Sequence, residues 1–359
     1  AAAGPRFWAR MGAWDGWWDG GWDGSWGAQP RAAAGNWRRW REGEDRNWQQ
    51  RMEVSGDESS FSGRKINAVQ IGLGTFGTVI QNLIGSHEEW DPIVGWLMEV
   101  VSERNPRRFQ GVAVEPVREH IERLRKQAAN QLPHFRLVQA AIGEDDVEDV
   151  EMTVLTKTAH DKLLASVPPD VQQQLARDLV YIRNMSCVGG PHPGFDLCRQ
   201  KAWRKFGVDI CLEPFRTSVW SYGRLARSLD FCGCELFIVD AEGHDTQILR
   251  SMIQHCSEEE MYGRCAWPDV VVFESAGLCD SKEGAASEAA VVSQLESHGY
   301  FVLVRCRMNT DMVRREALEK SKQLKRWVDK TVCQECRSRE LPMSYLEGRM
   351  LCRLCCDNW

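Results

Sequence analysis

Residues 69–77 read Val-Gln-Ile-Gly-Leu-Gly-Thr-Phe-Gly, and this glycine turn decides the fold that we expect. Gly72, Gly74 and Gly77 have the G-x-G-x-x-G spacing, between a predicted strand and a predicted helix. Glycine allows positive φ angles and lets the backbone approach a ligand closely. A helix that begins after such a turn presents free N–H groups to a bound ligand. We therefore expect a cofactor site at these glycines and Thr75, although the spacing alone does not identify the cofactor.

Apolar segments of strand length alternate with helical patterns after residue 65. The expected strands are 66–71, 111–115, 135–142, 235–240, 269–274 and 300–306. The expected helices are 79–85, 117–129, 220–229, 244–255 and 287–298. Strands that alternate with helices predict a parallel sheet, and almost continuously apolar strands are typical of a sheet covered on both faces. The expected fold class is α/β, with a doubly wound, mostly parallel, Rossmann-like sheet.

Composition excludes several classes of protein. The chain has 359 residues, of which 43% are hydrophobic and 27% charged, and its formal net charge is −6. This balance is typical of a globular protein and carries no general nucleic-acid signature. No apolar run approaches the roughly 20 residues of a membrane-spanning helix. The 14 cysteines are mostly scattered through strand and helix patterns, which indicates buried thiols in a reducing, cytoplasmic compartment.

The chain divides by composition into four predicted parts. Residues 1–60 repeat Trp-Asp-Gly and contain almost no Ile, Leu or Val, so we expect a disordered tail that builds no core. An alternative is an adhesive segment whose tryptophans bind a partner or a glycan. Residues 61–310 form the α/β domain, 311–330 a basic linker helix, and 331–359 a small cysteine-rich module.

Within the α/β domain, residues 144–210 are expected to be a long, irregular insert. A Pro-Pro pair and two clusters of proline with glycine interrupt it. Long loops in compact domains are often lids or binding elements. His192, Phe195 and Trp203 would then shape the pocket of a substrate.

Glu115 is the first acid at the end of an apolar strand after the glycine turn, in the segment Val-Ala-Val-Glu-Pro. A dinucleotide-binding protein places the acid that holds its ribose about 20 residues beyond the turn. Glu115 lies well beyond that distance, which weakens an NAD-binding interpretation. Its position suits a carboxylate that binds both ribose hydroxyls of another nucleoside cofactor. The alternative is an ordinary acid at a strand end.

Residues 236–245 read Leu-Phe-Ile-Val-Asp-Ala-Glu-Gly-His-Asp, an apolar strand that runs into Asp-x-Glu-Gly. The glycine turn and Val-Glu-Pro precede this block, as does Gln-Ala-Ala-Ile-Gly at 139–143, and Val-Val-Phe-Glu at 271–274 follows it. This order resembles FkbM-type methyltransferases, which use S-adenosylmethionine, over about 66–306. The resemblance implies a Rossmann-like methyltransferase fold. It also implies transfer of a methyl group to a hydroxyl of a small molecule or sugar.

The resemblance assigns roles to several residues. The three glycines of the turn would line the path of S-adenosylmethionine, and Glu115 would hold its ribose. Ala141 would lie near the adenine. Asp240 would lie where the fourth strand delivers residues to the reacting centre.

An acceptor hydroxyl must lose a proton, so we expect a base close to the reacting centre. The candidates are Asp240, Glu242, His244 and Glu274. His244 departs from the small residue usual in the family. Its ordinary pKa suits a base at neutral pH, and its alternative is a surface histidine at a helix start. For Glu242 the alternative is a cap of that helix, and for Glu274 a buried carboxylate bonded to a loop. These acids also permit a divalent metal, although their spacing does not require one.

The last 27 residues carry two Cys-x-x-Cys pairs, Cys333 with Cys336 and Cys352 with Cys355. Fifteen residues separate the pairs and can form a hairpin, a spacing typical of structural Zn²⁺. The alternatives are two disulfides or an iron–sulfur site. A zinc ribbon closed by four cysteines has no open coordination position for a substrate. With the basic stretch 314–330 before it, the ribbon would bind a protein or a nucleic acid.

Two other functions are consistent with the sequence. An NAD-dependent oxidoreductase would use the same fold and the same glycine turn. A non-catalytic interaction protein would keep a degenerate methyltransferase core and bind partners through the zinc ribbon. The intact glycine turn, Glu115 and Asp240 favour an enzyme over such a protein.

Overall fold

The computed structural model describes more than half of the chain. These residues are 66–74, 109–128, 135–184, 187–188, 195–231, 233–264, 267–275, 280, 284–306, 309–322, 324–325, 343–346 and 349–352. The chain divides into two units, Ala1–Gly63 and Arg64–Trp359, and all described residues belong to the second. The predicted tail at 1–60 therefore lies outside the described residues.

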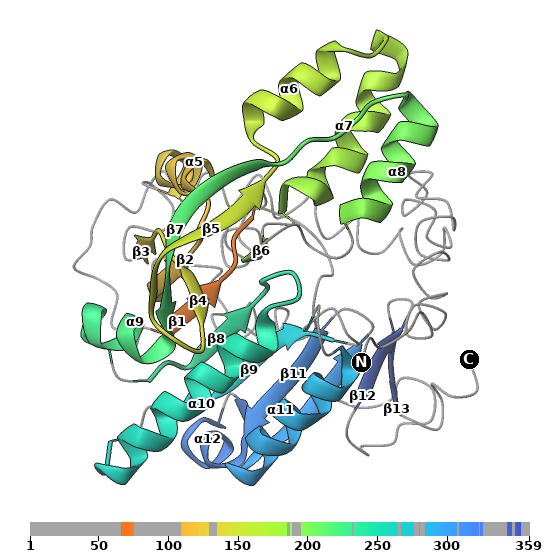
Figure 1. The fold of residues 1–359 in the computed structure, drawn as a ribbon. Coiled ribbons are helices and arrows are strands. Elements are labelled where there is room, and N and C mark those ends of the chain that lie inside the picture. Colours follow the sequence, from red (N-terminus) through yellow and green to blue (C-terminus); the bar gives the residue numbers. More distant parts are fainter. Residues whose placement is uncertain are drawn as a thin grey trace, which may run out of the picture. The chain divides into compact units, whose positions relative to one another are not determined.

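A nine-stranded sheet forms the centre of the described fold (Figure 1). Five adjacent strands of this sheet run parallel to one another. They are, in order, β3 (Phe135–Val138), β2 (Phe109–Val114), β1 (Ile66–Ile71), β8 (Leu236–Val239) and β9 (Val270–Glu274). Beyond β9 the sheet continues with β11 (Asn309–Arg314) and then β10 (Tyr300–Cys306), and β11 is antiparallel to both neighbours. The predicted α/β class with a mostly parallel sheet is confirmed.

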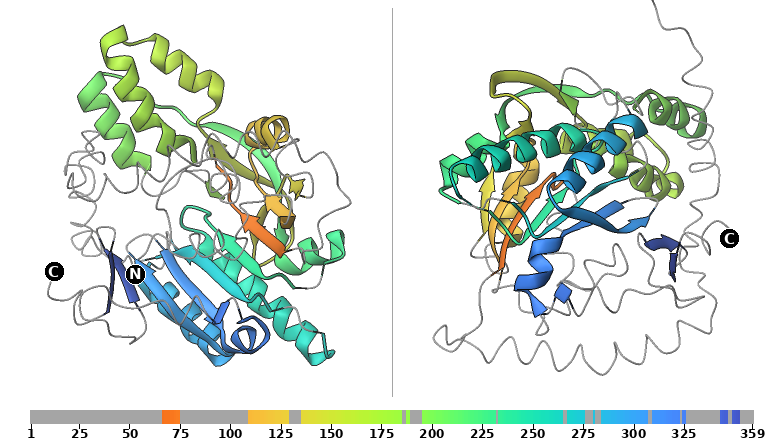
Figure 2. Two further views of the ribbon diagram at one scale, coloured as in Figure 1. Left: turned by 180° about the vertical axis from the view of Figure 1, so that it is seen from behind. Right: turned by 90° about the horizontal axis from the view of Figure 1, so that it is seen from below.

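Helices cover both faces of this sheet, as a comparison within β2 shows. Successive side chains of a strand point to opposite faces. Val112 and Val114 belong to the large core that also contains side chains of α9 (Tyr222–Leu229), α10 (Asp245–Met261) and α11 (Ala285–Ser297). Ala113, between them, packs with Ile121 and Leu124 of α5 (Arg118–Ala128). Figure 2 shows α10 and α11 side by side along one face. None of the described helices is long and apolar enough to cross a membrane.

The expectation of an irregular insert at 144–210 is wrong. A second sheet has the strand order β4 (Ala141–Gly143), β7 (Glu213–Ser221), β5 (Val147–Val154) and β6 (Cys187–Val188). Three helices accompany it, α6 (Lys157–Ala165), α7 (Pro169–Asn184) and α8 (Phe195–Phe206). The predicted strand 135–142 is also divided, because β3 ends at Val138 and the chain enters the second sheet at Ala141.

Pro169 and Thr156 of the insert begin helices rather than interrupt the chain. Pro169 is the first residue of α7, where its missing N–H group would have no partner within the helix. Thr156 caps α6, and its side chain accepts a hydrogen bond from Ala159 N at 3.1 Å. The same residue types occur in loops and at helix starts, which explains why the sequence pattern was misread.

The C-terminal boundaries also differ from the prediction. Residues 311–314, expected to begin a linker helix, belong to β11, and α12 (Arg315–Lys320) follows directly. The hairpin expected near the end is confirmed as β12 (Met343–Leu346) and β13 (Arg349–Cys352). Its strand β12 pairs in parallel with β10 of the main sheet. Three of the predicted zinc ligands, Cys333, Cys336 and Cys355, lie outside the described residues, as does the side chain of Cys352.

Gly72 follows β1 directly and lies against the backbone that follows β8. Its φ angle is +82°, and a Cβ placed on it would lie 1.7 Å from the Asp240 carbonyl oxygen. Asp240 N donates a hydrogen bond to the Ile71 carbonyl oxygen at 2.9 Å, and Gly72 N donates to that of Val114 at 3.0 Å. The carboxyl end of β1 is thus joined to both neighbouring strands, and only glycine fits at this position.

Alanine at Gly72 should destabilise the fold much more than alanine at Gly207. Gly207 also has a positive φ angle, +68°, but nothing lies within 4 Å of its added Cβ. Gly207→Ala should therefore lower the free energy of unfolding by about 1 kcal/mol, the effect of the left-handed conformation alone. Gly72→Ala adds a collision with backbone and should lower it by about 3 kcal/mol or more, measured by urea-induced unfolding. Equal losses in the two variants would contradict the close approach.

Candidate functional site

The sheet grows in two directions from β1, which makes the boundary between β1 and β8 the topological switch point. On one side of β1 lie β2 and β3, and on the other lie β8 and β9, which come later in the chain. Open α/β sheets bind ligands beyond the carboxyl ends of their strands at such a point. The glycine turn follows β1 and the Asp-Ala-Glu-Gly turn follows β8. The structure therefore brings the two sequence motifs together.

Glu115, directly after β2, is bonded to the glycine turn. Its side chain is buried, and Oε2 accepts hydrogen bonds from Leu73 N at 3.1 Å and Gly74 N at 2.9 Å. Oε1 accepts one from Val117 N at 2.9 Å and lies 3.2 Å from His120 Nδ1. A carboxylate offers about four acceptor positions, and these four contacts use them. Glu115 therefore joins the glycine turn to the start of α5.

Arg123 of α5 contacts the same turn. Its Nη2 donates a hydrogen bond to the Gly74 carbonyl oxygen at 3.1 Å. Burial lowers the pKa of Arg123, the positive charge of Arg183 lowers it further, and Glu115 and Glu119 oppose both effects. Arg183 Nη2 donates to Glu119 Oε1 at 2.6 Å, which ties α7 of the insert to α5. The sequence gave no sign that Arg123 contacts the turn, because nothing distinguishes it from the other charged residues of the predicted helix.

Asp245, the first residue of α10, holds the ends of β8 and β9 together. It is fully buried, and Oδ1 accepts a hydrogen bond from Ala241 N at 2.8 Å. Oδ2 accepts one from Glu274 N at 2.9 Å. Asp245 ends the 236–245 block, and the sequence motifs predict no role for it. An acid in the first turn of a predicted helix was the available signal, since carboxylates bind free N–H groups there.

The carboxyl groups at these strand ends raise one another's pKa. Desolvation of the Asp240 carboxyl group by the surrounding protein atoms, and then the negative charge of Glu115, raise its pKa to about 6. Burial, Asp240 and Asp245 raise the pKa of Glu242 to about 8. Burial raises the pKa of Asp245 to about 7, although backbone hydrogen bonds oppose it. The pKa of Glu274 is raised well above its usual value by burial and by the charges of three neighbouring acids.

Solvent reaches Asp240 more easily than the other members of this carboxyl cluster. As a residue Asp240 is exposed, whereas Asp245 and Glu274 are buried. Water therefore screens part of the effect of the neighbouring charges on Asp240. Because the groups interact, the cluster as a whole retains protons near neutral pH. An accessible carboxylate beside protonated acids is an arrangement that suits a general base.

The turn after β8 is conformationally strained. Glu242 has a φ angle of +50°, which is uncommon for a residue with a side chain, and Gly243 follows with +89°. Within the described part of the chain, Glu242 donates or accepts no hydrogen bond that would cap α10. His244 occupies the N-cap position without a side-chain cap bond, and its Nε2 lies 3.8 Å from a Cβ built on Gly143. Glu242 and His244 thus adjoin Asp240 without serving as helix caps.

The other predicted site residues lie in several places. Gly74 is at the turn itself, with a φ angle of +46°, whereas Thr75 and Gly77 lie outside the described residues. Ala141 is buried in the second sheet, in a cluster with Met152 and Val219. Its expected position near an adenine stays a prediction.

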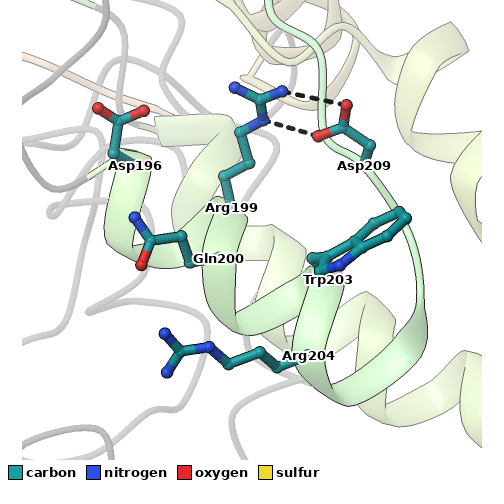
Figure 3. A pocket seen from close by; sticks show the side chains of 6 residues that line it. All are labelled: Asp196, Arg199, Gln200, Trp203, Arg204 and Asp209. Carbon is teal, nitrogen blue, oxygen red and sulfur yellow. Dashed lines mark hydrogen bonds and ion pairs between the residues drawn. The ribbon is translucent and has the colours of Figure 1, made fainter.

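The residues expected to shape a substrate pocket do not share one environment. Phe195 is buried on α8, Trp203 is 60% exposed on the same helix, and His192 lies outside the described residues. Figure 3 shows Trp203 in a hollow on the outer face of α8, formed by other residues than the strand-end carboxylates. In the described ranges, no group of three His, Cys, Asp or Glu side chains is arranged to hold a metal ion.

Comparison with known proteins identifies no relative. No family model matches this sequence, and no curated protein matches it either. The resemblance of residues 66–306 to methyltransferases thus stays a prediction, and the functional argument depends on the geometry of the strand ends.

Replacing Glu242 by glutamine should make the protein more stable at alkaline pH. Acids with raised pKa values bind more protons in the folded than in the unfolded state, between about pH 4 and pH 8. Their contribution to stability is therefore present at low pH and is lost as the pH rises through the folded pKa, about 8 for Glu242. The free energy of unfolding of Glu242→Gln is compared with that of wild type at each pH. After allowance for solvent screening, this difference should favour the variant by about 1 kcal/mol more at pH 8 than at pH 5.

The matched control is Glu296→Gln, because Glu296 is an exposed acid on α11 outside the cluster. Urea-induced unfolding of wild type and both variants at several pH values isolates the effect of the cluster. Acids such as Asp209, whose pKa is lowered by a hydrogen bond from Arg199, titrate in all three proteins. If stability depends on pH in the same way in Glu242→Gln and in wild type, the pKa of Glu242 is not raised in the folded protein.

Proposed function

We propose that this protein is an S-adenosylmethionine-dependent methyltransferase that transfers a methyl group to a hydroxyl of a small molecule or sugar. The observation that carries the proposal is the contact between Gly72 and the Asp240 carbonyl oxygen. Through it the glycine turn, with Glu115 beside it, adjoins the acidic turn at the switch point of the sheet. Such a place is where open α/β sheets bind their ligands. The proposed cofactor region at the glycine turn therefore lies beside the acidic turn, which suits proton transfer.

The order of strands favours a methyltransferase over an NAD-dependent oxidoreductase. The dinucleotide-binding fold has the order 3-2-1-4-5-6, with the sixth strand beside the fifth. Here the antiparallel β11 lies between β9 and β10, which are the fifth and sixth strands of the main sheet along the chain. This arrangement departs from the dinucleotide-binding order, which weakens the oxidoreductase interpretation. The late position of Glu115 supports the same choice.

The residues at the glycine turn fit a nucleoside cofactor. Gly72 and Gly74 both have positive φ angles and offer a ligand backbone without side chains. Glu115 is buried directly beside them, and ribose hydroxyls are donors that its oxygens can accept. Those oxygens already accept from Leu73 N and Gly74 N. Cofactor binding through Glu115 therefore requires the turn to give up at least one of these two bonds.

The acidic turn supplies the protein's own part of the reaction. When bound, S-adenosylmethionine supplies a methyl group that an acceptor oxygen takes up by in-line displacement. Asp240, accessible and with a pKa near 6, accepts the proton of the acceptor hydroxyl at neutral pH. Glu242, with a pKa near 8, stays largely protonated and can donate a hydrogen bond. Asp245 positions both by holding Ala241 N and Glu274 N.

The C-terminal cysteines form the second part of the proposal. We retain a structural Zn²⁺ held by Cys333, Cys336, Cys352 and Cys355. The hairpin β12–β13 supports this idea, since β13 ends at Cys352 and pairs with β12 over the expected return of the chain. Four thiolates close the coordination shell, so this metal would stabilise the fold or bind a partner rather than react.

The full chain should bind S-adenosylhomocysteine and not NADH in calorimetric titrations. Glu115→Gln should weaken binding of S-adenosylhomocysteine by roughly tenfold or more, because a buried amide replaces an acceptor of ribose hydroxyls. Glu122→Gln is the control, since Glu122 is an exposed acid of α5 that pairs with Arg118. Binding of NADH without binding of S-adenosylhomocysteine would instead identify an oxidoreductase.

With an acceptor found by transfer of labelled methyl groups, Asp240→Asn should lower turnover by about 100-fold or more. Its affinity for S-adenosylhomocysteine should change little, because the proposed role is proton transfer. An unaltered turnover in Asp240→Asn would remove Asp240 from the catalytic assignment, and Glu274 or His244 would have to be tested as the base.

A further inference from the structure

We propose that the outer face of α8 is a binding site for a neutral saccharide. A hollow of about 390 Å³ lies on this face (Figure 3), within the usual size range of small-ligand sites. Its lining consists of Asp196, Arg199, Gln200, Trp203, Arg204 and Asp209. The first five belong to α8, and Asp209 lies in the connection from α8 to β7. The site does not depend on the methyltransferase assignment.

The two faces of α8 are sharply different, as the spacing of its residues requires. Residues three, four and seven apart lie on one face of a helix. Phe195, Cys198 and Ala202 form the buried face. The five lining residues of α8 fall on the other face with the same periodicity. Burial raises the pKa of the Cys198 thiol on this face to about 11.

Trp203 is unusual for a helix face that is otherwise polar and open to solvent, because its large aromatic ring is exposed. Its side chain is 60% exposed, whereas Trp220 is half-buried and Trp267 is buried. Within the described part of the chain, no other ring or cation packs against the Trp203 indole. A large flat ring that remains open to solvent offers an apolar surface on which the C–H face of a pyranose can stack.

Polar groups surround this ring in fixed positions. Arg199 Nε and Nη2 donate hydrogen bonds to Asp209 Oδ1 and Oδ2 at 2.6 Å and 3.1 Å. This bidentate pair holds the chain after α8 beside the helix, and in Figure 3 Asp209 lies directly next to Trp203. Asp196, Gln200 and Arg204 add further acceptors and donors. One aromatic surface with both kinds of hydrogen-bonding group is what a polyhydroxylated ligand requires.

The charges of the lining select against nucleic acid. Two aspartates face two arginines, so the hollow carries no net charge. A nucleic acid would need an excess of cations to replace its counterions, and the two carboxylates would repel its phosphates. The lining therefore matches a neutral sugar better than a nucleic acid.

Saturation-transfer NMR with the full chain and a panel of neutral oligosaccharides tests this site. The panel contains gluco-, galacto- and manno-configured tetrasaccharides, and no S-adenosylmethionine is added. At least one member should bind, and Trp203→Ala should weaken that binding by roughly tenfold or more, as expected for the loss of one stacked ring. Trp203→Phe should retain most of the binding, because it keeps an aromatic face.

Tyr262→Ala is the matched control, since Tyr262 is an exposed aromatic residue that follows α10. It should leave saccharide binding unchanged. Absence of binding to every oligosaccharide of the panel, or binding that Trp203→Ala does not weaken, would overturn the proposal, as would stronger binding of oligouridylate. Calorimetry with S-adenosylhomocysteine on the same samples separates the two proposals. Trp203→Ala should bind S-adenosylhomocysteine like wild type, so either proposal can fail while the other holds.

Discussion

Gly72 packs against the Asp240 carbonyl oxygen so closely that no side chain fits between the two backbones. This contact fixes the distance between the turn after β1 and the turn after β8, and both turns carry the sequence motifs of the candidate site. The hydrogen bond from Asp240 N to Ile71 O adds to the constraint, because it extends the pairing of the two strands to their ends. If the backbones were further apart, the glycine turn and the acidic turn would be two unrelated loops.

Carboxylates stabilise this arrangement by accepting hydrogen bonds from backbone N–H groups. Glu115 accepts from the glycine turn, and Asp245 accepts from the ends of β8 and β9. Desolvation raises the pKa values of Asp240, Glu242 and Glu274, and the negative charges of neighbouring acids raise them further. The groups that hold the backbone in place therefore also adjust the proton affinity of the exposed acid, and structure and proposed chemistry depend on the same contacts.

Local patterns predicted the parts of this site that depend on local sequence. The glycine turn is predicted from its spacing after an apolar strand, and the Asp240 turn from its resemblance to a methyltransferase motif. The contacts of Asp245 depend on where β8 and β9 lie in the sheet, so the sequence offered no role for it. The sequence predicts a break at Pro169 because a proline before a loop and a proline at the first position of a helix look alike. It predicts helix over 311–314 because Asp-Met-Val-Arg has too few apolar residues to resemble a strand buried between two others.

A crystal structure of the full chain with S-adenosylhomocysteine is the most direct test of the central claim, that the Gly72–Asp240 contact joins a cofactor region to a reacting centre. The account predicts ribose hydroxyls hydrogen-bonded to Glu115, with the glycine turn released from one of its bonds to that carboxylate, and the ligand sulfur directed to Asp240. A ligand bound away from this edge of the sheet, or a Glu115 that keeps both turn bonds with the ribose out of its reach, would contradict the account.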